Sequence, residues 1–107
     1  MNKESLKGHS ELIILSALAV RPMHGYALSE FLKDQMPEAF SFGAGMIYPL
    51  LHKLEQRKLV KGEWKEVAGA NRRVYTLTKQ GRKMHETKKN EWHAFSKLMT
   101  KVIAQPS

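Results

Sequence analysis

The sequence contains no cysteine, which excludes a disulfide framework, thiolate catalysis and a cysteine-ligated zinc site. It also lacks a long apolar run, because the longest one, Leu12–Leu15, is far below the ~18 residues needed to cross a bilayer. Residues 1–8, MNKESLKG, show neither the apolar region nor the small-residue cleavage site of a signal peptide. We therefore expect a soluble, cytoplasmic protein without a membrane partner.

Sequence patterns of catalytic and metal sites are missing as well. The five histidines show no HExxH spacing, and His85 and His93 share their helical stripe with no carboxylate. Gly43 and Gly45 are not followed by the lysine of a phosphate loop. We expect no enzyme activity, no metal and no cofactor.

Basic residues are concentrated in one third of the chain. Residues 53–89 hold twelve Lys and Arg residues against four acids, so the whole formal charge of +8 lies there. Such a segment suits a polyanion, and nucleic acid comes before an anionic membrane surface. Composition alone leaves open a solvated basic face that serves solubility.

Three helices are predicted in the first half of the 107 residues. The first is Ser10–Val20, ended by Arg21 and Pro22. The second starts around His24 and Gly25, ends before Pro37, and buries Leu28, Phe31 and Leu32 with either Tyr26 or Ala27. Residues 38–45 form a loop before the third helix, which lies within Gly45–Val60.

The third helix combines a good apolar face with a proline. Ile47, Leu50, Leu51 and Leu54 recur at helical spacing, and Pro49 stands among them. Proline is tolerated where helical N–H groups lack partners, so a start at Gly45–Met46 would place Tyr48 in the first turn. A start at Gly43 would instead remove one backbone hydrogen bond.

A β-hairpin and a long helix follow. Leu59–Val67 and Arg72–Thr78 alternate in polarity around AGAN, Ala68–Asn71, whose glycine and asparagine tolerate positive φ. Thr78 is a suitable N-cap for a helix from Lys79 to about Ala104. This order predicts a fold that is mainly α with a β-hairpin (α+β). It is a winged helix-turn-helix with a long C-terminal helix, and Trp64, Tyr75 and Leu77 pack the hairpin onto the helices.

In a winged helix-turn-helix, the third helix enters the DNA major groove and the hairpin, called the wing, touches the adjacent backbone. Side chains on the outer face of the third helix and the arginines after the turn are therefore candidate DNA contacts. The alternatives are a half-buried Tyr48 that packs on the wing and a wing tip that is merely solvated. The candidate DNA-binding residues are Met46, Tyr48, His52, Lys53, Arg57, Arg72 and Arg73.

The last helix carries an apolar seam at a/d spacing. Such a surface either folds back on the domain or pairs with a partner, and a two-fold dimer suits two DNA half-sites about 34 Å apart. We expect residues 1–78 to form the DNA-binding domain and residues 79–107 the dimerisation helix. The candidate dimer contacts are Trp92, Phe95, Leu98, Met99, Val102 and Ile103.

Three segments resemble the PadR family of bacterial transcriptional regulators. They are PMHGYALSEFLKD (Pro22–Asp34), MIYPLLHKLEQRKLVKGEW (Met46–Trp64) and NRRVYTLTKQGRK (Asn71–Lys83). The single C-terminal helix is similar to that of the smaller PadR subfamily, whose dimers form through it. One departure is Lys58, which replaces the family's glycine after the third helix, so that this helix ends without the residue best suited to a left-handed cap.

The resemblance implies a homodimeric repressor in the bacterial cytosol, bound to the nucleoid when on its double-stranded operator and released by a small aromatic effector. It also implies DNA contacts at Tyr48, Arg72 and Arg73, and an effector site at Trp92 with Phe95 and Met99 as neighbours. Trp92 as plain dimer core stays open. The alternative function is a winged-helix adaptor that uses its basic face to bind an acidic protein.

Overall fold

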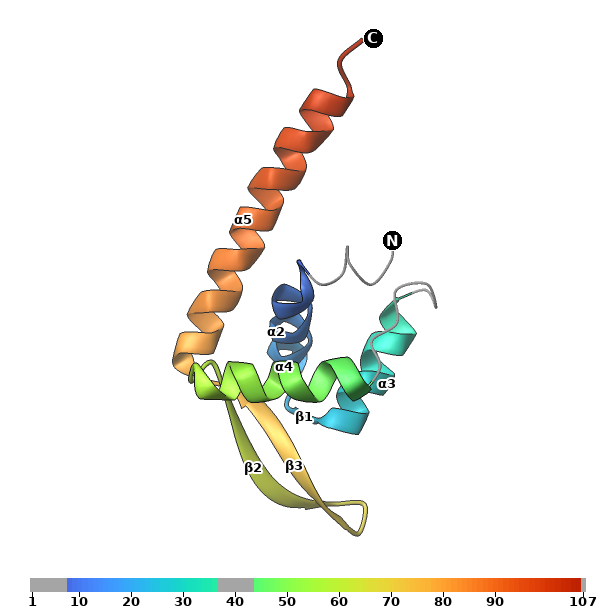
Figure 1. Cartoon of the computed structure of the whole chain (residues 1–107), viewed down its shortest axis with the longest axis vertical. Helices are drawn as coiled ribbons and strands as arrows, with labels where there is room; N and C mark the ends of the chain where they lie inside the picture. Colours follow the sequence, from blue (N-terminus) through green and yellow to red (C-terminus); the bar gives the residue numbers. More distant parts are fainter. Residues whose placement is uncertain (1–7, 37–43, 107) are drawn as a thin grey trace.

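The protein folds into helices and a small antiparallel sheet, with a long helix at the C-terminus (Figure 1). The computed structural model describes residues 8–36 and 44–106. The predicted α+β winged helix-turn-helix is confirmed. The loop predicted at residues 38–45 lies outside the described residues except at Ala44 and Gly45, where the prediction was wrong because both are helical. In chain order the elements are α2 (Ser10–Val20), β1 (Met23–His24), α3 (Gly25–Gln35), α4 (Ala44–Gln56), β2 (Val60–Val67), β3 (Ala70–Leu77) and α5 (Lys79–Ile103).

The core lies where α2, α3 and α4 meet the base of the sheet. The apolar stripe of α4 faces inward, since Ile47, Leu51 and Leu54 are fully buried. Burying side chains of this size contributes about 1.5–3 kcal/mol each. These contacts fix one face of α4 against the core and leave its opposite face to solvent.

The start of α3 is set by a histidine cap. The Ala27 N–H donates to Nδ1 of His24, 3.1 Å away, which satisfies one of the amides that a helix start leaves without a partner. Of the two candidates for the inner face of α3, Ala27 is partly buried and packs on the core, whereas Tyr26 is exposed and stacks on His24. Leu28 and Leu32 are buried as predicted, and Phe31 is partly buried.

The wing is the predicted hairpin with a tighter turn. Its turn residues are Ala68 and Gly69, with φ of 51° and 80°, which is typical of the two-residue turns that match strand twist. The prediction that Asn71 belongs to the turn was wrong, because Asn71 pairs with Glu66 inside the ladder. The sequence also did not reveal β1, a two-residue strand that pairs with β3.

The wing packs on the helices through Tyr75 and Leu77, which are buried as predicted. Trp64 was predicted to join them, and this was wrong, because its side chain is 63% exposed. Trp64 lies farther along the hairpin, opposite Arg73, where the strands have left the helical body.

The end of α4 is a left-handed cap without glycine. Lys58 adopts φ of 62°, the Lys58 N–H donates to the Glu55 carbonyl (2.9 Å), and the Leu59 N–H donates to the Leu54 carbonyl (3.0 Å). This pair of bonds is the Schellman arrangement. Lys58 therefore adopts the left-handed backbone conformation that glycine usually occupies at this position.

The start of α5 is hydrogen-bonded to the same segment, Lys58 and Leu59. The Thr78 hydroxyl donates to the Lys58 carbonyl (2.7 Å) and accepts from the Gly81 N–H (3.0 Å), which makes Thr78 the predicted N-cap. The Thr78 N–H donates to the Leu59 carbonyl (3.1 Å), and a Cβ on Gly81 would lie 1.9 Å from that oxygen. Glycine is therefore required in the first turn of α5.

From this junction α5 runs alongside α2 and then beyond the body of the molecule, whose extents are 59 × 30 × 20 Å (Figure 1). Met84 packs on the core, and Oγ of Ser16 lies 3.1 Å from Nε2 of His85. The first part of α5 thus packs on the domain, whereas the apolar seam that the fold-back alternative would have buried is exposed in the single chain. The division of the chain after residue 78 stays a prediction.

Candidate nucleic-acid interface

The outer face of α4 carries most of the predicted contacts. His52 and Lys53 are exposed, Tyr48 is 49% exposed, and Met46 is partly buried against the core. Within residues 8–36 and 44–106, neither the His52 nor the Lys53 side chain has a hydrogen bond or an ion pair. Both side chains are therefore available to a partner.

Pro49 lies inside α4, not at its very start. Because α4 begins at Ala44, Pro49 falls beyond the four amides that lack helical partners. The placement that started the helix at Gly45–Met46 was therefore wrong, and so was Tyr48 in the first turn. A proline here leaves the Gly45 carbonyl without its helical donor, at the solvent-facing side of α4.

Tyr48 packs on the start of α3, not on the wing. A Cβ on Gly25 would lie 2.5 Å from two carbons of the Tyr48 ring and 2.6 Å from its hydroxyl oxygen. Glycine at this position lets the ring lie directly on the α3 backbone. The contact fixes the ring beside the His24-capped first turn of α3, where backbone N–H groups favour an anion.

The two wing arginines lie on opposite faces of the hairpin. Arg72 is exposed and pairs across the strands with Lys65, so two cations share the outer face. Arg73 pairs with Trp64 on the other face, and its guanidinium lies 5.8 Å from the Trp64 ring centre and 5.9 Å from that of Tyr75. Of the two arginines, only Arg73 therefore turns toward the helices.

Arg73 connects the wing to α4. Its Nη2 donates to Oε2 of Glu55 at 2.5 Å, and the same oxygen accepts from the Gly62 N–H at 3.3 Å. A Cβ on Gly62 would lie 2.6 Å from the Arg73 side chain, so glycine makes room for the guanidinium. The hydrogen bond that Arg73 donates to Glu55 raises the pKa of Arg73 above its already high ordinary value. We call the pair Glu55 and Arg73 the wing latch.

Arg57 is held by an acid on the other flank of α4. Its Nη1 forms an ion pair with Oε1 of Glu11, in the first turn of α2. Oε2 of Glu11 lies 3.9 Å from Nζ of Lys88 on α5. Lys53, one turn before Arg57, lines a hollow with Ser10 and Glu11.

The structure thus divides the predicted DNA contacts into two groups. Met46, Tyr48, His52, Lys53 and Arg72 carry no ion pair in the described part of the chain, whereas Arg57 and Arg73 each have a glutamate partner. Sequence reasoning missed both glutamates. Glu55 was visible as an acid inside the basic segment, but Glu11 gave no signal, since 46 positions separate it from Arg57.

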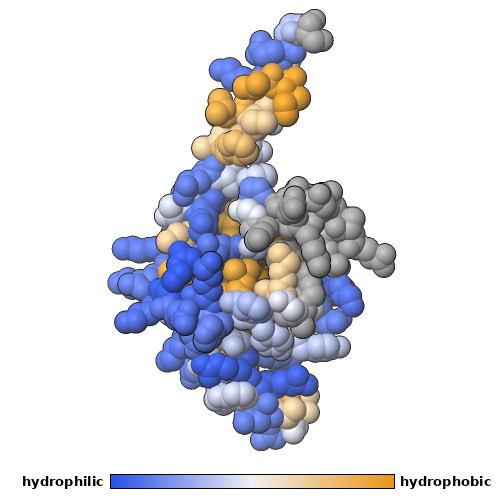
Figure 2. Space-filling view, in the orientation of Figure 1, coloured by the Kyte–Doolittle hydropathy of each residue, from blue (hydrophilic) through white to orange (hydrophobic). Residues whose placement is uncertain are grey.

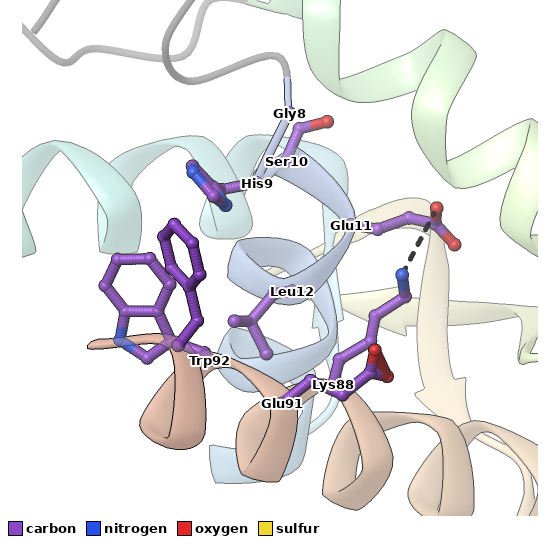
Figure 3. A pocket seen from close by; sticks show the side chains of 9 residues that line it. Gly8, His9, Ser10, Glu11, Leu12, Lys88, Glu91 and Trp92 are labelled. Atoms are coloured by element: carbon purple, nitrogen blue, oxygen red, sulfur yellow. Dashed lines mark ion pairs between the residues drawn. The ribbon is translucent and has the colours of Figure 1, made fainter. Parts of the chain in front are cut away.

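A second candidate site lies between α2 and α5 (Figure 3). It is a hollow of about 240 Å³ lined by residues of both helices, including His9, Leu12, Trp92 and Phe95. The His9 and Trp92 rings meet edge to face at 5.2 Å, and Phe95 lies 6.3 Å from Trp92. Met99, the third candidate effector residue, does not line this hollow.

The apolar seam of α5 continues beyond that hollow into solvent. Figure 2 shows the apolar side chains gathered toward the tip of α5, and Ile103 is 74% exposed. The predicted dimer residues are all among the exposed large hydrophobics: Trp92, Phe95, Leu98, Met99, Val102 and Ile103.

Residues 8–36 and 44–106 show neither a metal site nor a membrane span. They contain no group of three or more His, Asp or Glu side chains placed to hold a metal ion. None of their helices is long and apolar enough to cross a membrane.

Comparison with known proteins gives a consistent result. The profile described as "Transcriptional regulator PadR-like family" matches residues 14–87. A PadR-like transcriptional regulator from Bacillus cereus superposes with a TM-score of 0.87 at 28% identity, over 97% of this chain and 100% of that one. A PadR family transcriptional regulator from Eggerthella lenta gives 0.83 at 27% identity, over 96% and 88%.

One curated relative comes from a transposon. It is an uncharacterised 37.1 kDa protein of Streptomyces fradiae transposon TN4556, 29% identical over 94 residues. The match covers 88% of this chain but spans only about a quarter of the length of that relative.

Proposed function

Because the chain belongs to the transcriptional regulator PadR-like family, we propose that it is a homodimeric repressor that binds operator DNA in the bacterial cytosol and is released by a small aromatic effector. Membership of this family implies DNA-binding regulation and a regulatory rather than a catalytic role. The proposal adds the direction of regulation, the oligomeric state and the effector.

The observation that supports DNA binding best is the placement of the available polar and cationic groups. Tyr48, His52 and Lys53 lie on one exposed face of α4, and Arg72 with Lys65 lies on the outer face of the wing. In Figure 1, α4 and the wing occupy the end of the molecule away from the tip of α5. A helix that enters a groove and a wing that contacts the adjacent backbone require this arrangement.

The exposed seam of α5 supports the homodimer. Apolar side chains at a/d spacing along the last turns of a solvent-facing helix are stable when a second helix covers them. Pairing two copies through α5 would leave α4 and the wing of each protomer uncovered. The α4 helices of the two protomers would be the recognition helices, and each could then meet one DNA half-site.

The hollow beside Trp92 supports an effector site. Trp92 and Phe95 present two aromatic rings at its edge, and Trp92 is 41% exposed in the single chain. Stacking between these rings and a planar ligand would use surface that the fold itself does not need. Trp92 then serves both the dimer and the effector.

The DNA prediction is tested by titrating a duplex from upstream of the gene at several salt concentrations. Affinity should fall steeply with salt, and Arg72→Ala should reduce the slope of log K against log salt by about one. Tyr48→Phe should weaken binding without loss of stability, since its hydroxyl donates to no described protein group. Lys97→Ala, near the tip of α5, is the control that should leave the slope unchanged.

A duplex that is not shifted even at low salt would contradict the DNA-binding proposal and favour the adaptor function. The effector is tested separately in a Trp64→Phe background, in which Trp92 is the single tryptophan. A panel of planar aromatic compounds should quench its emission. Unchanged emission across the panel would leave Trp92 as dimer core alone.

A further inference from the structure

A single carboxylate, that of Glu11, joins three helices. From the first turn of α2 it forms an ion pair with Arg57 at the end of α4 through one oxygen. Its other oxygen lies 3.9 Å from Nζ of Lys88 on α5. Arg57 is a predicted DNA contact, and Lys88 lies one helical turn before Trp92, so Glu11 stands between the two candidate sites.

Glu11 also belongs to the wall of two separate hollows. One is the hollow beside Trp92, in which Glu11 and Lys88 form the end nearer to α4 (Figure 3). The other lies against α4 and is lined by Met46, Pro49, Leu50 and Lys53 together with Ser10 and Glu11. The first turn of α2 is therefore the wall between the effector candidate and the recognition helix.

The charges around Glu11 do not balance, since its one carboxylate lies between two cations, Arg57 and Lys88. The side chains are partly exposed, Arg57 by 40%, Glu11 by 28% and Lys88 by 32%, so each pair is weak enough to be exchanged. A DNA phosphate near Arg57 or a ligand group near Lys88 would compete for the same partners. Whatever changes the position of Glu11 at one site changes its interaction at the other.

We propose that Glu11 is the positioning residue that couples the hollow beside Trp92 to Arg57 of the recognition helix. In the DNA-free protein Glu11 holds Arg57 back from phosphate, and Lys88 sets how firmly it does so. This inference deepens the proposed regulation and rests on it for its biological meaning. Because both cations share the Glu11 carboxylate, we expect a change at Arg57 to alter the surroundings of Trp92.

The shared carboxylate allows a test that needs neither a ligand nor DNA. In the Trp64→Phe background, acrylamide quenching of Trp92 is measured for the parent, Glu11→Gln, Arg57→Gln and the double variant. Arg57→Gln should change the quenching constant, although Arg57 does not line the hollow. In the presence of Glu11→Gln, the same substitution should change nothing. A shift that is absent, or that persists without Glu11, would overturn the proposal.

The DNA arm measures affinity for the upstream duplex with the same variants. Glu11→Gln should tighten binding by roughly twofold to fivefold, the range that a partly exposed ion pair can supply. This gain should vanish in the Arg57→Gln background, whereas general destabilisation would persist there. Glu86→Gln is the matched control, because Glu86 pairs with Lys89 within α5 (3.1 Å) and should not alter affinity.

The two arms separate the two ideas. If no variant binds DNA, the proposed function fails while the quenching cycle still decides whether Glu11 is the link. If DNA binds and Glu11→Gln tightens it equally with and without Arg57, the link is wrong and the DNA-binding proposal stands.

Discussion

The formal charge of a segment overstates the number of cations that are free to bind a phosphate, as two arginines of this protein show. Arg57 and Arg73 both belong to the segment that carries the whole excess of +8, yet each has a glutamate partner. An arginine held in this way orders an element more than it attracts a phosphate. The attractive charge of the interface therefore rests on residues such as Lys53, Lys65 and Arg72.

Lys58 gives a test at the same scale. A side chain in the left-handed region costs about 1 kcal/mol, which glycine avoids. Lys58→Gly should therefore raise the free energy of unfolding by about 0.5–1 kcal/mol, less the backbone entropy that glycine loses. Urea denaturation at one protomer concentration measures this. Lys58→Ala keeps the strain and removes the charge, and an equal gain in that variant would contradict the explanation.

The sequence predicted positions whose role follows from a local pattern. The buried stripe of α4 follows from the helical period of 3.6, and the cap at Thr78 follows from a hydroxyl that directly precedes a helical segment. The exposed Trp64 and the partners Glu11 and Glu55 depend on distant segments, whereas the left-handed Lys58 forms a local cap that no glycine marks in the sequence. No spacing encodes such contacts.

Among the elements, the wing depends most on one interaction. The wing latch joins its strands to α4 where the hairpin leaves the helical body, so its loss should let the wing swing relative to the recognition helix. Glu55→Gln and Arg73→Ala should therefore both weaken DNA binding, by about twofold to fivefold, the range that a partly exposed ion pair can supply. Fluorescence anisotropy with labelled duplex would measure both.

The sign of the Glu55→Gln effect is decisive. Simple electrostatics predicts tighter binding when an acid near the interface is neutralised. Weaker binding in Glu55→Gln therefore identifies the latch. Tighter binding in Glu55→Gln together with weaker binding in Arg73→Ala would show that Arg73 contacts phosphate directly. Glu63→Gln, whose acid pairs with Lys61 on the wing, controls for charge alone.

At the scale of the whole molecule, the order of helices and hairpin was enough to predict the winged fold. The sequence could not determine which part of α5 packs on the domain and which part extends into solvent. That division depends on which side chains of α2 meet α5, and contacts such as Ser16 with His85 carry no sequence signature.

The assembly prediction concerns the exposed end of α5. Val102→Glu should raise the dimer dissociation constant about tenfold or more, because an unpaired carboxylate would enter an apolar seam. Analytical ultracentrifugation over a concentration series measures it. Thr100→Glu places the same charge on the polar stripe with His93 and Lys97 and should leave the dimer intact. Equal dissociation in both variants would argue against a dimer through this seam.

The start of α5 is held against the end of α4, so α5 can act as a lever that pivots at this contact. The contact consists of Lys58, Leu59, Thr78 and Gly81. The helix has 25 residues, hence a length of about 37 Å, and its fastened end lies directly beside the end of α4. A tilt of about 5° at this pivot corresponds to roughly 3 Å at the far tip of such a rod. If the tips are paired, the same tilt displaces the two DNA-reading ends relative to each other. A small repacking of side chains along the apolar seam of α5 would then change the distance between the two DNA-binding ends, and with it the half-site spacing that the dimer fits.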